Sequence, residues 1–354
     1  MKIHLLSGFL GSGKTTAVLQ AARLLMKQGI PVGVITNDQG IKLVDAGLFS
    51  SQGIPGRQVG NGCFCCNYNQ LEAQIQSLEQ DSQPQVVFAE SVGSCTDIVA
   101  TVLKPLRMRR PNAAITISVF ADIRLLHILL SNNQPVFDDA VNYIYFKQLE
   151  EAGIIIVNKT DLASEVQLQQ VKQLMAERYR DKTIVYQNSL DEDSITHWLF
   201  LLNGQAAVTP ASLDISYDIY GAGEAMLAWF DEELHLQSAA GNAARCAIEL
   251  MRMIAERITS LELPIGHLKF LLNSREKISV TATAGLPESI SFAESGQQAT
   301  LLVNARVQTS PSALAAVMDD AIRQIRGLYN CEIKNYGRAS FQPGFPTPVH
   351  RIAD

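Results

Sequence analysis

The sequence predicts an α/β fold with a mostly parallel sheet, followed by a smaller α+β domain. Over the first 205 residues, short apolar and β-branched runs alternate with longer helical patterns, which is typical of a parallel sheet with crossover helices. From about residue 225 the expected order changes to strand, helix, two strands, helix and strand. This order fits a βαββαβ unit, in which two helices cover one face of a sheet.

The strands of the first part are expected where the apolar runs are too continuous to leave a face exposed to water. These runs cover residues 2–7, 31–36, 85–89, 114–120, 153–157 and 183–186. The helices expected between them cover residues 14–28, 70–80, 97–107 and 166–179. Small residues at 203–210 then interrupt the pattern, so we place a first domain at 1–205, a linker at 206–224 and an accessory domain at 225–354.

Two helices and two half-exposed strands are predicted in the accessory domain. Apolar residues at i, i+3 and i+4 spacing between Ala247 and Leu261 indicate the first helix. Ser310 and Pro311, an N-cap followed by proline at the first helical position, begin the second. Residues 277–283 and 299–307 alternate as strands do.

Composition excludes several classes of protein. The 354 residues are 47% hydrophobic and 18% charged, which is too apolar for a disordered chain. A net charge of -6 supplies no basic field for nucleic acid. The apolar runs are too short to cross a membrane and the N-terminus has no signal-peptide pattern, so we expect a cytoplasmic protein without a membrane partner.

The segment Gly8-Phe-Leu-Gly-Ser-Gly-Lys14-Thr15-Thr16 follows an expected strand and begins an expected helix. It satisfies G-x-x-x-x-G-K-[ST], the P-loop pattern, whose backbone N–H groups cradle phosphate oxygens. The lysine then reaches the β- and γ-phosphates and the first threonine ligates Mg²⁺. We therefore predict a P-loop NTPase domain whose phosphate-binding residues are Gly8, Gly11, Ser12, Gly13, Lys14, Thr15 and Thr16.

Two further carboxylates are candidates for the magnesium and water site. Glu90 ends an apolar strand and could hold Mg²⁺ directly or through water, while Gly93 could offer its N–H to the γ-phosphate. Glu90 could instead be an acidic helix cap. Asp38, after the second expected strand, could also orient the attacking water, or could lie in a solvated turn.

Asn158-Lys159-Thr160-Asp161 follows the strand expected at 153–157, where ligand-binding loops of a parallel sheet lie. N-K-x-D is the guanine-reading pattern of GTPases, because the aspartate accepts hydrogen bonds that guanine offers and adenine does not. The alternative is an ordinary loop. We predict that GTP is the nucleotide and that Asn158, Lys159 and Asp161 contribute to its site.

Three cysteines lie within four positions at Cys63, Cys65 and Cys66. Thiolates are soft ligands that suit Zn²⁺ or Co²⁺, and a partial set leaves positions open for transfer. In a strand Cys63 and Cys65 would share a face, whereas a turn after Cys65 could bring Cys65 and Cys66 together. Core packing and a redox dithiol are the alternatives. The isolated Cys95, Cys246 and Cys331 are expected to be small buried residues.

Five motifs carry a resemblance to a known family. In chain order they are the P-loop, Asn37-Asp-Gln-Gly40, Gly62-Cys-Phe-Cys-Cys66, Glu90-Ser-Val-Gly93 and Asn158-Lys-Thr-Asp161. Together they resemble the CobW/HypB/UreG family of GTPases, and most closely its CobW-like branch. The resemblance implies a GTPase that binds a transition metal through the cysteines. It further implies delivery of a metal or metal-containing cofactor to a client metalloprotein or cofactor-dependent enzyme, and a nucleotide-dependent homodimer. Thr15 and Glu90 would then serve the magnesium site and Cys63, Cys65 and Cys66 the transition metal.

The sequence departs from this family at two places. The motif at residue 37 reads Asn-Asp-Gln-Gly where relatives more often have Asn-Glu-Phe-Gly, and it is flanked by Thr36 and Ile41 where relatives can carry carboxylates. Fewer oxygen ligands are therefore expected beside the cysteines. The histidine-rich tract of many members is missing, since the six histidines are isolated. A zinc-storage role is therefore not expected.

We expect a GTP hydrolase in which Lys14 and Mg²⁺ stabilise charge on the γ-phosphate and Asp38 or Glu90 orients water. GTP would close the loop from Asn37 to Cys66 into a metal-binding geometry, and hydrolysis would relax it. Two rivals share parts of the pattern. A small-molecule kinase would need the P-loop but not Asn158–Asp161, and a nucleotide-switched interaction protein would need no metal.

Overall fold

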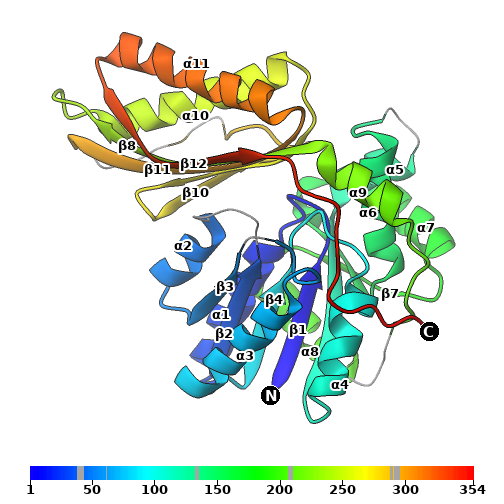
Figure 1. The fold of residues 1–354 in the computed structure, drawn as a ribbon. Coiled ribbons are helices and arrows are strands. Elements are labelled where there is room, and N and C mark those ends of the chain that lie inside the picture. The colour runs from blue at the N-terminus through cyan, green and yellow to red at the C-terminus, as the bar shows by residue number, and fades with distance from the viewer. Residues whose placement is uncertain (38–43, 61, 132–134, 206–209, 288–289, 291–295) are drawn as a thin grey trace. The chain divides into compact units, whose positions relative to one another are not determined.

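A computed structural model describes residues 1–354 except 38–43, 61, 132–134, 206–209, 288–289 and 291–295 (Figure 1). The chain divides into two compact units. Unit 1 contains Met1–Gln39, Gln52–Gly223 and Phe345–Asp354, and unit 2 contains Gly40–Ser51 and Glu224–Gly344. No helix among the described residues combines the length and the apolar character that a membrane span needs.

Unit 1 is built on a seven-stranded parallel sheet of order β3-β2-β4-β1-β5-β6-β7. Its strands are β1 (Lys2–Ser7), β2 (Val32–Asn37), β3 (Gly56–Val59), β4 (Val86–Glu90), β5 (Ala114–Asp122), β6 (Ile154–Asn158) and β7 (Thr183–Gln187). The central strands are buried along almost their whole length, as their unbroken apolar runs predict. The predicted mostly parallel sheet is thus confirmed, and β3 is a short extra edge strand.

Helices connect these strands. They are α1 (Lys14–Lys27), α3 (Tyr68–Asp81), α4 (Lys104–Arg109), α5 (Ile123–Leu130), α6 (Asp139–Glu150), α7 (Glu165–Arg178), α8 (Glu192–Gln205) and α9 (Tyr217–Ala225), with a short 3₁₀ turn at Thr160–Leu162. The helix expected at 97–107 is divided. Its first part is a π-helix at Val99–Leu103, preceded by Asp97 at φ 62°. The left-handed backbone at Asp97 explains why the helix does not begin there.

Unit 2 is a five-stranded antiparallel sheet of order β10-β9-β11-β8-β12. Its elements are α2 (Val44–Ser51), β8 (Leu227–Gln237), α10 (Ala243–Ser260), β9 (Ile265–Leu272), β10 (Glu276–Val280), β11 (Gln298–Gln308), α11 (Pro311–Tyr329) and β12 (Glu332–Phe341). The two long helices α10 and α11 pack against each other and cover one face of the sheet (Figure 1). The predicted α+β class is confirmed.

The strand count of unit 2 differs from the expected βαββαβ order. Three strands rather than two lie between α10 and α11, because β9 precedes the expected pair. Seven of the eight residues of β9 are buried, so this strand lacks the alternation that marks a half-exposed strand.

Two segments belong to units other than those expected from chain order. Residues 345–354, placed by sequence in the accessory domain, group with unit 1. Residues 40–51, placed in the first domain, group with unit 2, where Asp45 of α2 pairs with Lys269 and Lys277. Ion pairs between residues this far apart in the chain cannot be predicted from local sequence patterns.

Candidate functional site

The P-loop joins β1 to α1 and requires glycine at two points. Gly8 has φ 125°, and a Cβ there would lie 2.2 Å from the carbonyl oxygen of Phe120. Gly13 has φ 94°, and its Cβ would lie 2.3 Å from Nδ2 of Asn158. Lys14 Nζ crosses the loop and donates to the carbonyl of Gly8 at 2.6 Å. The buried hydroxyl of Ser12 has no hydrogen-bond partner in the described part of the chain, which fits a phosphate oxygen as its partner.

Thr15, in the first turn of α1, meets Glu90 at the carboxyl end of β4. The hydroxyl of Thr15 donates to Oε1 of Glu90 at 2.9 Å, and both side chains are buried. The loop after Glu90 lies directly on the P-loop, since a Cβ on Gly93 would be 2.9 Å from the backbone nitrogen of Leu10. A hydroxyl beside a carboxylate is the oxygen donor set that Mg²⁺ prefers, so these residues fit that ion. Asp38, the other candidate, lies outside the described residues.

The Asn158-Lys-Thr-Asp161 segment lies beside the P-loop at the end of β6. Asn158 Nδ2 donates to the carbonyl of Ser12 at 2.9 Å, and Lys159 Nζ donates to that of Gly11 at 2.6 Å. Lys159 also pairs with Asp122 at 2.8 Å and has a left-handed backbone with φ 62°. Asp161 is exposed. The segment is therefore anchored to the phosphate cradle by two side chains and leaves its aspartate open to solvent.

The three cysteines converge on one point. A turn runs from Cys63 to Asn67, whose N–H donates to the carbonyl of Cys63 at 2.9 Å. This turn gathers all three sulfurs, rather than only two as in either arrangement considered from the sequence. Sγ of Cys63 lies 2.8 Å from that of Cys65 and 3.3 Å from that of Cys66, and the last two are 3.8 Å apart. Cys63 and Cys65 are 3% and 2% exposed, while Cys66 is half-buried.

These distances fit a single metal ion. Two sulfurs on one tetrahedral zinc, with bonds of about 2.3 Å, lie about 3.8 Å apart. The cluster already has this spacing between Cys65 and Cys66, and the distances from Cys63 to Cys65 and Cys66 need to widen by about 1 Å and about 0.5 Å. Hydrogen bonds with Cys65 and Cys66 hold the pKa of Cys63 well below its usual range, and the hydrogen bond with Cys63 raises the pKa of Cys66 to about 11.

Asn37, at the end of β2, holds the cysteine turn in place. Its Nδ2 donates to the carbonyls of Val59 and Gly62 at 3.0 and 2.8 Å, and its Oδ1 accepts the N–H of Phe64 at 2.8 Å. The neighbouring Thr36 is paired in register with Glu90 of β4. Asn37 therefore connects the β2–β4 strand pair, in which Thr36 is in register with Glu90, to the sulfur cluster.

Two other contributors were not recognised from the sequence. Cys95, expected to be a small buried residue, is buried, but its thiol also hydrogen-bonds Cys63. Its position two residues after Gly93 is the signal that could have drawn attention to it. The C-terminal segment reaches the cluster as well, because the N–H of Thr347 donates to Sγ of Cys66 at 3.3 Å. The local sequence pattern does not predict this contact.

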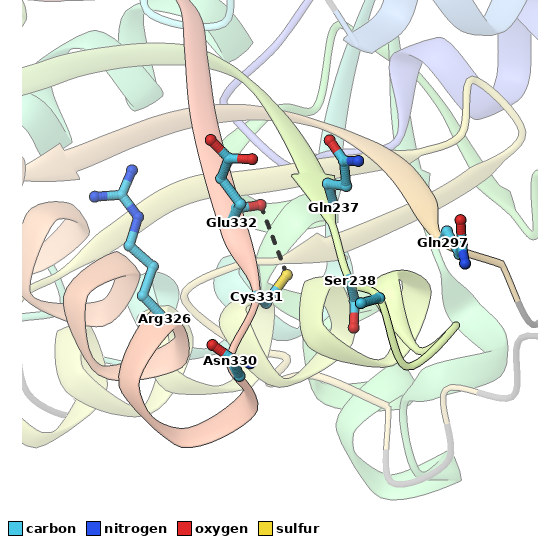
Figure 2. Close-up of a pocket in the computed structure, with 8 residues that line it drawn as sticks. Gln237, Ser238, Gln297, Arg326, Asn330, Cys331 and Glu332 are labelled. Carbon is cyan, nitrogen blue, oxygen red and sulfur yellow. Dashed lines mark hydrogen bonds between the residues drawn. The ribbon is translucent and has the colours of Figure 1, made fainter.

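A hollow of about 500 Å³ in unit 2 lies apart from these motifs in sequence. It is lined by polar side chains of β8, α11 and β12, among them Gln237, Arg326 and Glu332 (Figure 2). Its cysteine, Cys331, donates to the carbonyl of Glu332 at 3.7 Å. Burial raises the pKa of Cys331 to about 12, so this thiol is a poor nucleophile. The hollow holds none of the candidate site residues.

The family model for the CobW/HypB/UreG nucleotide-binding domain matches residues 2–186, which is more than half of the chain. The chain belongs to this family. The match covers the P-loop, the cysteine turn, Glu90 and the Asn158–Asp161 segment together. The resemblance noted from the sequence motifs is thereby confirmed.

Curated relatives from bacteria cover parts of the chain. The zinc chaperone YeiR of Escherichia coli is 26% identical over 217 residues, covering 60% of this chain and 62% of its own length. The zinc chaperone YjiA of the same organism is 34% identical over 96 residues, covering 27% and 30%. The zinc chaperone CobW of a Sinorhizobium species is 24% identical over 202 residues, covering 49% and 54%. Each match therefore spans less than two thirds of the relative.

Solved structures that are similar to part of this chain include HypB from Helicobacter pylori in complex with nickel. It is 19% identical, with a TM-score of 0.45, and the alignment covers 61% of this chain and 92% of that one. HypB from Archaeoglobus fulgidus is 16% identical with a TM-score of 0.42, covering 58% and 90%.

Proposed function

We propose that this chain is a Mg²⁺-dependent GTPase that binds zinc or cobalt through Cys63, Cys65 and Cys66. It would couple GTP hydrolysis to delivery of the ion, or of a metal-containing cofactor, to a client protein. The observation that carries the proposal is the convergence of three sulfurs on a turn held by Asn37. A strand pair links that residue to the magnesium side of the nucleotide site.

The nucleotide half of the proposal rests on the P-loop region. The loop glycines and the buried Ser12 hydroxyl would receive the phosphates, and Lys14 would leave the carbonyl of Gly8 to neutralise the β- and γ-oxygens. Thr15 and Glu90 would hold Mg²⁺, which supplies positive charge against the transferring phosphoryl group. Glu90 or Asp38 would orient the attacking water. The exposed Asp161 would select guanine.

The metal half rests on sulfur chemistry. Three thiolates with a tetrahedral spacing bind zinc-class ions, and a fourth position is left for a water, a partner or a client ligand. Such an incomplete set suits transfer. The relatives that match this chain are named zinc chaperones, which supports zinc as the first ion to test.

The rival functions make different demands on the site. A small-molecule kinase has no use for a guanine-reading segment anchored to its P-loop. A nucleotide-switched interaction protein has no use for three sulfurs held within bonding distance of one ion. Transfer of phosphate to an acceptor other than water would reveal the first rival. Indifference of GTP turnover to Zn²⁺ and Co²⁺ would favour the second.

The decisive experiment is a Co²⁺ titration of the full chain followed by absorption spectroscopy. Wild-type protein should develop the near-ultraviolet sulfur-to-metal band and the visible bands of tetrahedral cobalt. The double variant Cys65→Ser/Cys66→Ser should lose tight binding and the sulfur band. Its affinity for GTP without metal should stay close to wild type, because neither residue belongs to the phosphate cradle.

Cys331→Ser is the matched control, because it removes a buried cysteine that lies outside the cluster. It should bind Co²⁺ as the wild type does. An unchanged sulfur band in the double variant would refute the metal half of the proposal. Equal affinity of the wild type for ATP and GTP would refute the guanine assignment.

A further inference from the structure

Two residues of the C-terminal segment, Thr347 and Val349, hydrogen-bond to the cysteine turn. The N–H of Thr347 donates to Sγ of Cys66 at 3.3 Å, and the N–H of Val349 donates to the carbonyl of Cys65 at 2.9 Å. The ring of His350 packs edge-on against Tyr68, with centroids 4.8 Å apart, at the start of α3. Three successive contacts thus bind this segment along the residues that carry the sulfurs.

The end of the segment is anchored by a buried charge. Arg351 Nε donates to Oδ2 of Asp97 at 2.8 Å, and the Asp97 side chain is 2% exposed. Arg351 also donates to the carbonyl of Leu213 at 2.8 Å. The terminal Asp354 pairs with Lys104 and accepts the N–H of Ser212 at 2.6 Å. These contacts hold the segment at several points far apart in sequence.

Asp97 has a particular place in the chain. It lies four residues after Gly93, in the loop that follows β4 and rests on the P-loop. Tyr217 donates to the same carboxylate oxygen at 2.7 Å. The anchor of the C-terminal segment is therefore part of the loop whose other end carries Glu90, the residue beside Thr15.

We propose that Phe345–Asp354, drawn in red at the end of the chain in Figure 1, is a strap that closes over the cysteine cluster and controls exchange at its sulfurs. Thr347 and Val349 make the closing contacts, and the pairing of Arg351 with Asp97 is the latch. A metal ion or an acceptor reaches the cluster when the strap lifts. Control of metal exchange rests on the proposed function, whereas closure over the thiols does not.

The Thr347 contact limits access to Cys66, because the backbone that carries this N–H lies against Sγ and covers it on that side. Lifting the strap breaks a set of hydrogen bonds while the sheet stays intact, which is a local opening rather than global unfolding. Because the latch lies on the loop after β4, nucleotide bound at that loop would bias the opening.

The first experiment measures thiol modification in the metal-free full chain. Thr347→Pro removes the N–H donor together with the threonine side chain, and it places proline between Pro346 and Pro348, where the backbone is already restricted to extended conformations. Thr347→Ala is the matched control, because it keeps the N–H. We expect Thr347→Pro and the latch variant Arg351→Ala to raise the alkylation rate of Cys66 about ten-fold.

Peptide mass spectrometry separates the cysteines, and Cys331 serves as the internal reference. Thr347→Ala and Arg323→Ala, an exposed arginine of α11, should react as the wild type does. An unchanged rate at Cys66 in both Thr347→Pro and Arg351→Ala would overturn the strap. This result does not depend on metal binding, so it is distinguishable from a failure of the proposed function.

The second experiment follows transfer of bound Co²⁺ to a chelator. Arg351→Ala and a chain ending at Gly344 should release the ion about ten-fold faster than the wild type. His350→Ala keeps the backbone donors of the strap, so it should release Co²⁺ close to the wild-type rate. If His350→Ala alone abolished binding, the segment would be a ligand donor and the strap proposal would be overturned. Faster thiol modification without any Co²⁺ binding would leave the strap standing and refute the proposed function.

Discussion

The amide of Asn158 illustrates how one side chain can join two motifs. Its Nδ2 donates to the P-loop at Ser12, and its Oδ1 accepts both the N–H and the hydroxyl of Ser189, at 3.2 and 2.7 Å. Both ends of the amide are therefore used within the protein. Asn158 ties the phosphate cradle to the end of β6, and the reading of the base would depend on Asp161.

A second residue of interest is Glu151, which is completely buried. It accepts the hydroxyl of Thr96 at 3.2 Å and the N–H of Val99 at 3.1 Å. These two donors flank Asp97, the anchor of the strap. Burial raises the pKa of Glu151 to about 8, from 4.5 in a solvated carboxyl. The folded chain therefore retains a proton that the unfolded chain has lost at neutral pH.

Glu151 should make the free energy of unfolding fall as pH rises from about 4.5 to 8. Its contribution is fully present below the unfolded pKa and is lost as pH rises through the folded pKa, at up to about 1.4 kcal/mol per pH unit. Glu151→Gln mimics the protonated form, so it should remove this slope and be at least as stable as the wild type at pH 8.5. Urea unfolding at pH 5.5, 7 and 8.5 measures the dependence of the free energy of unfolding on pH.

Glu177→Gln, at an exposed position of α7, is the control and should keep the wild-type slope. Since both variants share every other titrating group with the wild type, the difference between them isolates Glu151. A Glu151→Gln variant with an unchanged slope would show that this carboxyl is ionised in the folded protein.

At the scale of elements, the helices and strands that could be predicted from the sequence are those determined by interactions between residues close together in the chain. The central strands of unit 1 appear as continuous apolar runs, and α11 is marked by Ser310, whose hydroxyl accepts the N–H of Ala313 at 3.2 Å. The motif glycines also lie where a turn demands them. What could not be predicted depends on contacts between distant residues, such as Asn37 holding the cysteine turn and α2 joining unit 2.

The P-loop shows why its last glycine cannot carry a side chain. Gly13→Ala would combine a left-handed backbone with a Cβ 2.3 Å from the Asn158 amide that anchors β6. The amide would have to move, and the hydrogen bond to Ser12 would be lost. We expect GTP affinity to fall about 100-fold or more, because the cradle depends on this geometry. Fluorescent-nucleotide titration measures the loss, and circular dichroism checks that the helices persist.

Gly29→Ala is the control that introduces backbone strain without a steric clash. Gly29 also has a left-handed backbone, with φ 75°, but nothing lies within 4 Å of a Cβ built there. This control should cost only about 1 kcal/mol of stability and leave GTP affinity unchanged. Equal nucleotide affinity in Gly13→Ala and Gly29→Ala would contradict the role given to the Gly13–Asn158 contact.

At the scale of the whole molecule, the chain passes from unit 1 to unit 2 and back more than once. It leaves unit 1 after β2, contributes α2 to unit 2, and returns before the cysteine turn. It returns a second time at Phe345 to form the strap. In unit 2, Asp45 of α2 pairs with Lys269 and Lys277 at 2.5 and 2.7 Å, so α2 is firmly held there. The segments that carry the nucleotide motifs and the sulfur cluster are therefore connected along the chain to segments of unit 2.

If nucleotide and metal are coupled, their effects on each other must be equal. Should Mg-GTP tighten Co²⁺ binding by some factor, bound Co²⁺ must tighten Mg-GTP by the same factor, and such couplings are usually about 1 to 3 kcal/mol. We expect this with a non-hydrolysable GTP analogue and not with GDP. Calorimetric titration of each ligand with and without the other measures both factors independently.

Asn37→Ala tests whether Asn37 transmits the coupling between nucleotide binding and metal binding. The substitution removes the two hydrogen bonds that join the end of β2 to Gly62 and Phe64 of the cysteine segment and a third to Val59 of β3, while Lys14, Thr15 and the sulfurs are untouched. Each ligand alone should still bind, but the coupling factor should fall toward one. Asn203→Ala, at an exposed position of α8, should keep the wild-type factor. Full coupling in Asn37→Ala would place the connection elsewhere. A factor of one in the wild type would mean that GTP hydrolysis does not drive metal release.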